Sequence, residues 1–426
     1  MPARAQTMES DPGSAGGLHL FQAHGVEIEY MLVDGRTLDV LPVADRVLQT
    51  AGGGDIIDDV EWDGMVWSNE LVLHVIELKT REPGRTLAGQ ARTFQRGVAE
   101  IRRLLAPMGG TLMPGAAHPW MDPHRETRLW PHEDSAVYET FNRIFDCRGH
   151  GWSNIQAIHL NLPFSGDDEF VRLHSAIRLV LPILPGLSAS SPYLDGAATG
   201  LLDSRMEAYR KNCARIPSVT GRIIPEAVGS IEEYRRRILG KIYEDLAPHD
   251  PGGIVRHEWA NARGAIARFE RNTIEIRVID TQECPAADVA VLDLTTRVIR
   301  ALVEERWSRA EDQARWPEEP LYDLLLEAVR SAEEARIPDG DYLRCFGMKG
   351  VRNGPTIGDL WRHLADEVLE EGEESRPAID VILSEGPLAR RLLGTAGARP
   401  SRAELAATYR RLCECLAEGR SFTATR

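Results

Sequence analysis

Polar and apolar residues alternate along the stretch 272–280, which reads Asn-Thr-Ile-Glu-Ile-Arg-Val-Ile-Asp. Side chains two residues apart on a β-strand point to the same face. Thr273, Glu275 and Arg277 are therefore expected on one face, with the intervening aliphatic side chains on the other. The pattern predicts a sheet with an apolar back and a charged front.

The same alternation recurs in two other stretches. Glu27 and Glu29 alternate with apolar residues in Gly-Val-Glu-Ile-Glu-Tyr, and His159 and Asn161 do so in Ala-Ile-His-Leu-Asn-Leu. Each stretch places two polar groups on one face of a strand. Three strands with polar fronts predict a shared concave site.

A fourth strand is predicted over 67–80, with Glu77 and Lys79 on one face near its end. On a single continuous strand, Glu70 would point to the face opposite Glu77 unless a β-bulge intervenes. The parity of this strand therefore decides whether Glu70 can join the same polar face.

Helices are predicted where apolar residues are three and four positions apart. Between the predicted strands these segments are 85–106, 135–145, 168–184, 230–246 and 286–307. Beyond Pro317 the chain is expected to be helical at roughly 320–336, 356–371, 376–394 and 402–417. Residues 1–17, rich in Gly, Ser, Pro and Ala, are expected to form a disordered leader.

The charge balance argues against binding of long polyanions. The 426 residues carry a formal net charge of −15, whereas nucleic-acid backbones attract clustered lysines and arginines. A small anion could still be held by a few arginines.

The sequence contains no GxxxxGK[ST], GxGxxG or GxSxG motif, so it gives no support for a phosphate loop, a dinucleotide fold or a serine hydrolase.

The cysteines and the hydropathy pattern predict a cytoplasmic protein. Six cysteines are scattered without a CxxC pair, which is typical of free thiols in a reducing compartment. No apolar run has the length of a membrane span, and the first 17 residues lack the apolar centre of a signal peptide.

Four carboxylates would crowd one concave face if the predicted strands pair: Glu27, Glu29, Glu77 and Glu275. Two unit charges about 4 Å apart repel by roughly 4 kcal/mol at an effective dielectric constant near 20, so such a group needs counterions. Mg²⁺ prefers carboxylate oxygens and keeps positions open for water and nucleotide phosphates. The imidazole of His159 could complete such a metal site.

Each pattern also has a purely structural interpretation. A Glu-x-Glu pair on one strand is most often a solvated outer face, and Arg277 beside Glu275 could be an ordinary cross-strand ion pair. His118 could line a site or simply mark a turn. Arginines can bind carboxylates or phosphates through paired hydrogen bonds, although most arginines of an acidic protein lie on its surface. The candidates are Arg205, Arg215, Arg263, Arg268 and Arg271.

In combination these segments resemble the glutamate-cysteine ligase superfamily, carboxylate-amine ligases that share a catalytic fold with glutamine synthetase. Residues 25–30 match its opening Gly-[IV]-Glu-x-Glu strand, and 75–80 its Val-Glu-x-x-Thr element. Residues 116–119 are similar to its Gly-Thr-His-Pro segment, with Ala at the first two positions. The other similar segments are 155–162 with its His-x-Asn strand, 190–205 with its Ser-Pro and Thr-Gly-x(4)-Arg region, and 273–280 with its Glu-x-Arg strand.

The resemblance implies ATP with two or three Mg²⁺ ions, or Mn²⁺, on the concave face of the sheet. Its implied metal ligands are Glu27, Glu29, Glu77, His159 and Glu275, with Glu70 as an additional candidate. Arg277 and Glu275 would be catalytic, with Arg277 contacting the transferring phosphoryl group. The implied nucleotide-binding arginines are Arg277, Arg268 and Arg263, and the implied substrate-binding residues are Arg205, His118 and Thr80.

We therefore predict an α+β enzyme with an antiparallel, partly closed sheet and helices on its convex side. Residues 18–307 would form the catalytic domain, and 308–426 a helical region packed on it. The expected reaction is ATP-dependent amide formation through an acyl phosphate, with glutamate and cysteine as the default substrates. Alternatives are another amino acid, an amine or ammonia as acceptor, a guanidino kinase on the same scaffold, and a catalytically silent nucleotide-binding protein. A homodimer is a further expectation from the resemblance.

Overall fold

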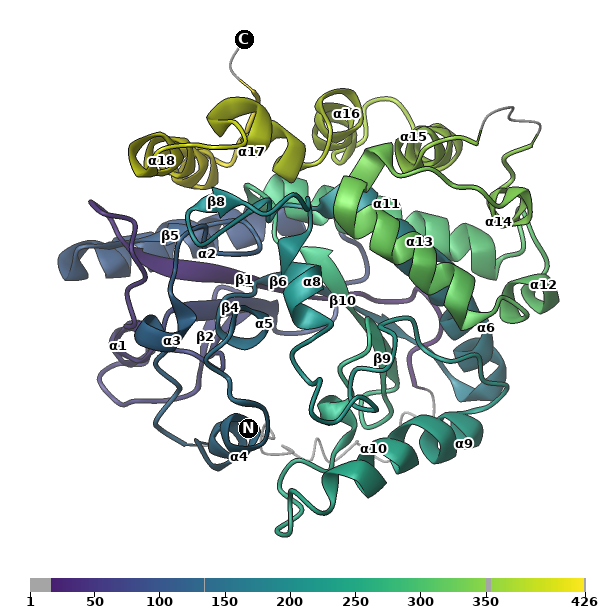
Figure 1. The fold of residues 1–426 in the computed structure, drawn as a ribbon, viewed down its shortest axis with the longest axis horizontal. Helices are drawn as coiled ribbons and strands as arrows, with labels where there is room; N and C mark the ends of the chain where they lie inside the picture. The colour runs from purple at the N-terminus through teal and green to yellow at the C-terminus, as the bar shows by residue number, and fades with distance from the viewer. Residues whose placement is uncertain (1–16, 134, 350–353, 425–426) are drawn as a thin grey trace.

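The centre of the protein is an eight-stranded antiparallel sheet (Figure 1). The computed structural model describes residues 17–133, 135–349 and 354–424, so the predicted leader lies outside the described residues except for residue 17. The sheet has the order β2-β3-β4-β1-β6-β10-β9, and β5 pairs with β1. Its strands are β1 (Gly25–Asp34), β2 (Asp59–Trp62), β3 (Met65–Asn69), β4 (Val75–Thr80), β5 (Gly110–Met113), β6 (Ala157–Pro163), β9 (Ala265–Arg268) and β10 (Thr273–Asp280). A separate pair is formed by β7 (Tyr193–Leu194) and β8 (Ala197–Ala198).

The back face of the sheet is apolar and covered by helices, as the alternation predicts. Val26, Ile28 and Tyr30 of β1 belong to the main core, which α2 (Gln90–Leu105), α6 (Gly166–Val180) and α11 (Pro285–Val303) complete. The Tyr30 hydroxyl donates a 2.8 Å hydrogen bond to Asp288 on α11, because a buried phenol needs a partner. The predicted α+β fold with an antiparallel sheet backed by helices is confirmed.

The front face of β1 changes character along its length. Glu27 and Glu29 come first, and then Met31 and Val33 join a second apolar cluster with α17 (Leu388–Ala396) and α18 (Arg402–Glu418). The C-terminal helices therefore lie over one end of the front face (Figure 1). Since they cover only the apolar end, the acidic end is left for chemistry.

The predicted single strand over 67–80 is wrong, because this segment forms the hairpin of β3 and β4. Ser68 pairs with Glu77 across the hairpin, and the residues between the strands form a loop. That loop contains no Gly or Pro to mark it. It is held by tertiary backbone hydrogen bonds instead: Leu32 N to His74 O and Trp130 N to Leu71 O.

The predicted helices are present with some breaks. The predicted helix 230–246 consists of α9 (Ile231–Tyr234), a π-helical turn (Arg235–Leu239) and α10 (Gly240–Leu246). The predicted helix 376–394 is two helices, α16 (Arg376–Glu385) and α17, separated at Gly386, whose φ is +86°. The others include α1 (Ala44–Ala51), α3 (Pro123–Glu126), α4 (Ser135–Phe145), α5 (His150–Ser153), α7 (Pro185–Ser188), α8 (Ser204–Tyr209), α12 (Ala310–Ala314), α13 (Glu318–Ser331), α14 (Gly340–Cys345) and α15 (Ile357–Val368).

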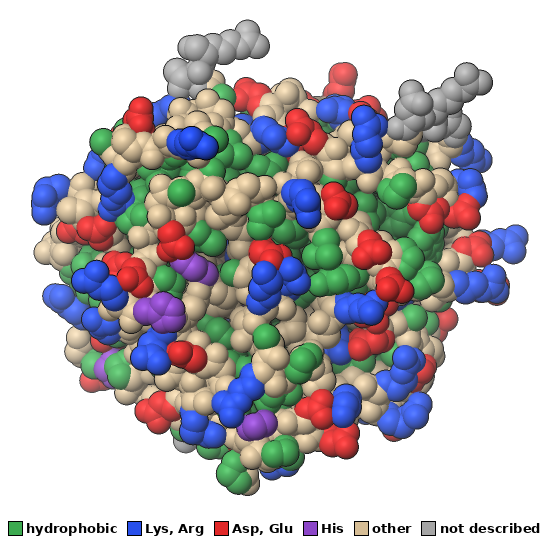
Figure 2. All heavy atoms as spheres, in the orientation of Figure 1, with side chains coloured by type: hydrophobic (Ala, Val, Ile, Leu, Met, Phe, Trp, Pro, Cys, Tyr) green, Lys and Arg blue, Asp and Glu red, His purple; other side chains and the backbone are tan. Residues whose placement is uncertain are grey.

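The cysteines and the surface agree with the composition. All six cysteines are buried and free. On the face shown in Figure 2, acidic and basic side chains are interspersed rather than gathered into a patch of one sign. Within the described ranges, every helix is too short or too polar to cross a membrane.

Candidate active site

The register of the four central strands brings the predicted acidic residues together. Glu27 of β1 lies opposite His159 of β6 on one side and opposite Lys79 of β4 on the other. Glu29 lies opposite Glu77. Because directly paired residues of an antiparallel sheet share a face, these side chains form a single polar group on the front.

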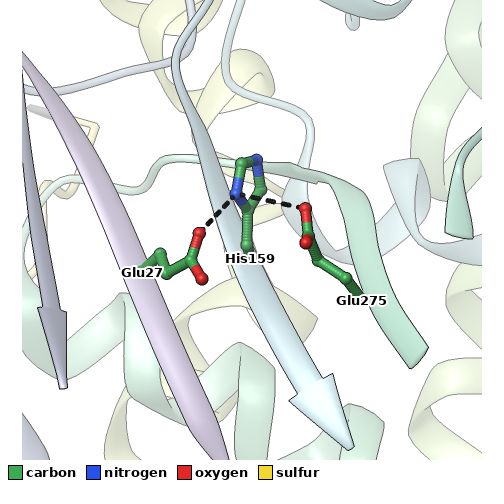
Figure 3. A group of neighbouring side chains, drawn as sticks. All are labelled: Glu27, His159 and Glu275. Carbon is green, nitrogen blue, oxygen red and sulfur yellow. Dashed lines mark hydrogen bonds and ion pairs between the residues drawn. The ribbon is translucent and has the colours of Figure 1, made fainter. Parts of the chain in front are cut away.

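His159 occupies the centre of this group (Figure 3). Its Nδ1 is 3.1 Å from Glu27 Oε2 and 3.9 Å from Glu275 Oε1. Ligand atoms of Glu27, His159 and Glu275 lie within 4.8 Å of one another, as do those of Glu29, Glu77 and His159. The two triads share His159 and together contain all five predicted metal ligands. We call these five residues the front-face cluster.

The pKa values show how strongly these groups interact. Burial opposes protonation of His159, but its hydrogen bond to Glu27 and the charges of Glu29, Glu27 and Glu275 raise its pKa to about 9. Burial raises the pKa of Glu77 to about 7, against the opposing charge of Lys79. The cluster thus concentrates negative charge in a poorly solvated space, where a bound cation is strongly favoured.

The donor set fits a hard divalent cation. Four carboxylates and one imidazole offer ligand atoms at close range, and oxygen-rich sets of this kind suit Mg²⁺ and Mn²⁺. His159 would have to give up its proton to coordinate an ion through Nδ1. The cluster residues therefore fit the metal that the sequence predicts.

Glu70 belongs beside this cluster, which the single-strand interpretation of 67–80 could not show. It follows β3 directly, two residues after Ser68, so it lies toward the front. Burial and the charge of Glu29 raise its pKa to about 7. The side chain of Asn69 donates to the Glu70 carbonyl at 3.2 Å and to the Tyr138 hydroxyl at 3.0 Å, which ties this loop to α4.

Two arginines hold Glu275, one at each carboxylate oxygen. Arg277 Nε lies 2.8 Å from Oε1, and Arg268 Nη1 lies 2.7 Å from Oε2. Both guanidinium groups thus border the front-face cluster, and a quarter of the Arg277 side chain is exposed. The ion pair of Arg277 and Glu275 is present, and it leaves the other donors of Arg277 for a ligand.

A β-bulge in β10 brings a further carboxylate to the front. The pairing of β10 with β6 steps from Ile276 opposite Leu160 to Ile279 opposite Ile158. The extra residue reverses the parity of the rest of the strand, so Asp280 points forward, whereas strict alternation would place it on the back. Sequence periodicity alone could not locate this bulge.

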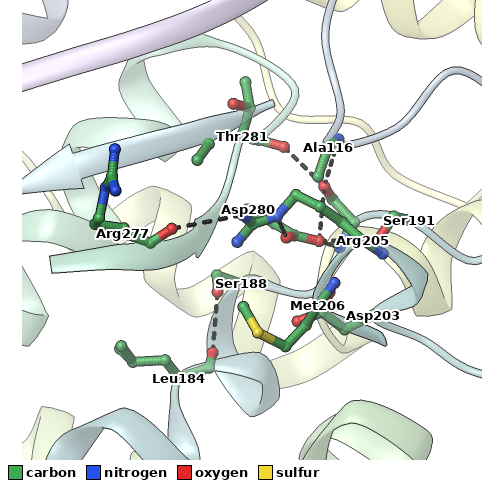
Figure 4. Close-up of polar contacts among 12 residues, drawn as sticks. Ala116, Leu184, Ser188, Ser191, Asp203, Arg205, Met206, Arg277, Asp280 and Thr281 are labelled. Carbon is green, nitrogen blue, oxygen red and sulfur yellow. Dashed lines mark hydrogen bonds and ion pairs between the residues drawn. The ribbon is translucent and has the colours of Figure 1, made fainter. Parts of the chain in front are cut away.

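Asp280 and Arg205 form a buried ion pair beside the cluster (Figure 4). The second oxygen of Asp280 accepts hydrogen bonds from Ser190 N at 2.8 Å and Ser191 Oγ at 3.1 Å. Arg205 Nη1 donates to the Arg277 carbonyl at 3.4 Å. Its buried Nη2 has no hydrogen-bond partner among the described residues. A fixed guanidinium with an unpartnered Nη2 can offer its two N–H groups to a carboxylate that displaces the side chains enclosing it.

Three other predicted site residues have structural partners. Arg263 forms a bidentate salt bridge with Glu226, in which Nε donates to Oε2 at 2.7 Å and Nη2 donates to Oε1 at 2.6 Å. Burial lowers the pKa of His118 to about 3, and its Nε2 lies 2.8 Å from the Leu38 carbonyl. Thr80 Oγ1 accepts a hydrogen bond from the Val26 amide at 3.1 Å. None of these contacts involves the front-face cluster.

Two cavities of the described structure lie outside the cluster. One of about 450 Å³ lies between α2, α11 and the loop before α16, lined by residues such as Gln95, Val289 and Ser375. Another of about 440 Å³ is bordered by Tyr243 and Glu258. The candidate site is therefore identified by its chemistry and not by cavity volume.

Comparisons with known proteins show the family to which the chain belongs. The family model for glutamate-cysteine ligase family 2 matches residues 23–409. A protein of Archaeoglobus fulgidus named "Uncharacterized protein" is 32% identical over 92% of this chain and 98% of its own length. A Streptomyces avermitilis protein named "Putative glutamate--cysteine ligase 2-1" is 27% identical over 82% of this chain and 87% of its own.

A solved structure has the same fold. The glutamate–cysteine ligase of Francisella tularensis in complex with AMP superposes with a TM-score of 0.57 at 10% identity, covering 92% of this chain and 88% of that one. Fold, site and family together define an ATP-dependent ligase that joins a carboxylate to an amine. The chain belongs to glutamate-cysteine ligase family 2, which confirms the resemblance predicted from its motifs.

Proposed function

We propose that the front-face cluster is the active site of this ligase and that it binds Mg²⁺ or Mn²⁺ together with ATP. The observation that carries the proposal is the convergence of five predicted ligands, from four strands, around His159. Glu27, Glu29, Glu77, His159 and Glu275 would hold the ions, with Glu70 beside them. Bound ions would neutralise the phosphate oxygens of the nucleotide.

Arg277 is proposed to stabilise the transferring phosphoryl group. Burial alone would lower the pKa of Arg277, but the charges of Glu275 and neighbouring groups outweigh this and raise it above its ordinary value, so the guanidinium stays charged. Its Nε is held by Glu275, which orients the remaining donors. A preoriented cation of this kind stabilises negative charge that spreads over the phosphoryl oxygens in the transition state. Arg268, fixed to the other oxygen of Glu275, is proposed to contact the nucleotide.

Arg205 is proposed to bind the carboxylate substrate through its free Nη2. In the proposed reaction, a substrate carboxylate oxygen attacks the terminal phosphorus of ATP, and ADP leaves. The amine nitrogen then attacks the acyl-phosphate carbon, phosphate leaves with the C–O bond electrons, and the nitrogen loses a proton. Holding both reactants in one site replaces a bimolecular encounter with an oriented reaction. Arg263, His118 and Thr80 remain predicted ligand contacts, although each has a structural partner.

Glutamate and cysteine are the proposed substrates, with other amino acids, amines or ammonia as alternative acceptors. The test combines a panel of carboxylates and amines with ATP and Mg²⁺ and measures phosphate release and the mass of the amide. Phosphate release that is the same with every acid and amine would contradict the proposal. In the alternative of a silent nucleotide-binding protein, amide would be absent while nucleotide still bound, and the variants Glu27→Ala and Glu275→Ala would weaken that binding.

We further propose a cytoplasmic homodimer without nucleic-acid partners, in which residues 18–307 carry the catalysis. The proposal follows from the family and from the acidic composition. Light scattering of the purified full chain tests the oligomeric state. A monomer at micromolar concentration would contradict it.

A further inference from the structure

Lys79 lies among the metal-binding carboxylates but has no part in the chemistry proposed above. It stands directly opposite Glu27 in the pairing of β1 with β4. Its Nζ is 3.3 Å from Glu77 Oε2, and 32% of its side chain is exposed. An ammonium group therefore borders the front-face cluster at the point where β1 and β4 meet.

The contacts of Glu77 show what Lys79 does in the free protein. Ser68 Oγ donates a 2.7 Å hydrogen bond to Glu77 Oε2, the same oxygen that Lys79 approaches. These two donors fix the Glu77 carboxylate through Oε2, and its other oxygen, Oε1, remains able to coordinate a metal ion. Ser68 on β3 and Lys79, two residues along β4, thus aim Glu77 together.

The charge of Lys79 also acts on any ion in the cluster. A lysine ammonium has an ordinary pKa near 10.4, so it is charged at neutral pH. A divalent cation bound by Glu27 or Glu77 would lie within a few ångströms of this fixed charge, and like charges repel strongly where water is scarce. Nucleotide phosphates would offset the ammonium and add their own oxygen ligands.

We propose that Lys79 is a positioning residue that acts as a built-in counterion of the cluster. It aims Glu77 and lowers the affinity of the nucleotide-free site for divalent cations, so that tight ion binding awaits the nucleotide phosphates. The inference rests on the proposed function of the front-face cluster. It concerns whether the ions bind tightly before the nucleotide or only together with it. The identity of the ligand residues does not determine this order.

The test is a titration of the full chain, freed of metal, with Mn²⁺. Electron paramagnetic resonance measures the concentration of free Mn²⁺ at each point. Lys79→Met keeps most of the side-chain volume without the charge, and Lys79→Arg keeps the charge. Lys241→Met is the matched control, because Lys241 pairs with Glu244 and Asp245 on α10. Without nucleotide, Lys79→Met should lower the Kd for Mn²⁺ about fivefold or more, whereas the other two variants should match wild type.

With a non-hydrolysable ATP analogue present, the difference between Lys79→Met and wild type should shrink to less than about twofold. An unchanged or raised Kd in Lys79→Met would overturn the counterion role, as would an equal change in Lys79→Arg. Thermal melting checks the fold, and Lys79→Gln replaces Lys79→Met if the latter melts early. If wild type binds no Mn²⁺ even with the analogue, the proposed active site itself fails, and the role of Lys79 fails with it.

Discussion

His159 meets two conflicting requirements. In the metal-free protein its imidazolium neutralises the carboxylates around it, and its Nδ1 is bonded to Glu27 at 3.1 Å. As a metal ligand it must be neutral. The alternation along β6 predicted that its side chain points to the polar face of the sheet, and the match to a His-x-Asn strand predicted that it is a metal ligand. Its position between two triads depends on the pairing of β1, β6 and β10, which the sequence does not encode locally.

We predict that the metal-free protein loses stability as pH rises from about 7 to 9. The pKa of His159 is about 9, above its ordinary 6.5. A raised pKa contributes stability that is complete below the ordinary value and disappears as pH rises through the raised one, here by roughly 3 kcal/mol. Glu70 and Glu77, with pKa values of about 7, act in the same direction at lower pH. Urea unfolding in EDTA measures this.

His159→Gln is the control for that experiment. It should remove most of the loss between pH 7 and 9, since His159 is the group whose pKa is raised to about 9. A wild-type stability that stays flat or rises from pH 7 to 9 without metal would contradict the prediction.

Asp280 is expected to contribute more to the free energy of unfolding than a carboxylate in an exposed ion pair does. Asp280→Asn leaves the buried guanidinium of Arg205 without its counter-charge, and breaking one side of a buried ion pair costs about 3 kcal/mol or more. The free energy of unfolding in urea measures the effect. Asp195→Asn, at an exposed pair with His150, should change it by less than about 0.5 kcal/mol. Similar values for the two variants would refute the difference.

At the scale of elements, periodicity predicted most of the fold but not its interruptions. The apolar and polar faces of β1, β6 and β10 follow from spacing of two, and the helices from spacing of three and four. The β3–β4 hairpin and the bulge of β10 are held by contacts with distant segments, such as the bond from Arg277 N to Gly264 O. Alternation alone therefore assigns Glu70 and Asp280 to the wrong face.

Gly386 is the break between α16 and α17 that periodicity also missed. Its φ of +86° disfavours any residue with a side chain, and an added Cβ would lie 2.9 Å from Arg390 atoms. Gly386→Ala should destabilise the protein by about 1–2 kcal/mol. Gly394→Ala, at an exposed position within α17 with open space around it, should stabilise it by up to about 1 kcal/mol. Thermal melting compares the two, and a Gly386→Ala variant as stable as wild type would contradict this prediction.

At the scale of the whole molecule, the C-terminal helices are joined to the segment that holds the site. Arg391 of α17 forms a fully buried ion pair with Glu283, which follows Asp280 by three residues. The same guanidinium donates to the Phe422 carbonyl and, at 3.1 Å, to the Gly386 carbonyl. The end of the chain thus fixes the loop after β10, a link that helical periodicity could not predict.

Arg391→Met should lower the free energy of unfolding by about 3 kcal/mol, because Glu283 would remain buried and unpaired. The double variant Arg391→Met, Glu283→Gln should recover part of the loss, since it removes the orphaned charge. Arg362→Met, at an exposed pair with Asp359, should cost less than about 0.5 kcal/mol. Urea unfolding of wild type and these three variants measures the effect, and a double variant less stable than Arg391→Met would argue against charge as the cause.

The cluster also sets the moment at which the protein can capture an ion during its synthesis. Its first ligands lie on β1, near the start of the chain, and the last lies on β10. A nascent chain on the ribosome therefore exposes Glu27 and Glu29 long before Glu275 emerges to complete the first triad. The triad of Glu29, Glu77 and His159 can form once β6 has paired with β1, whereas the triad that contains Glu275 must await the later pairing of β10 with β6, so the two halves of the cluster are completed one after the other as the polypeptide grows.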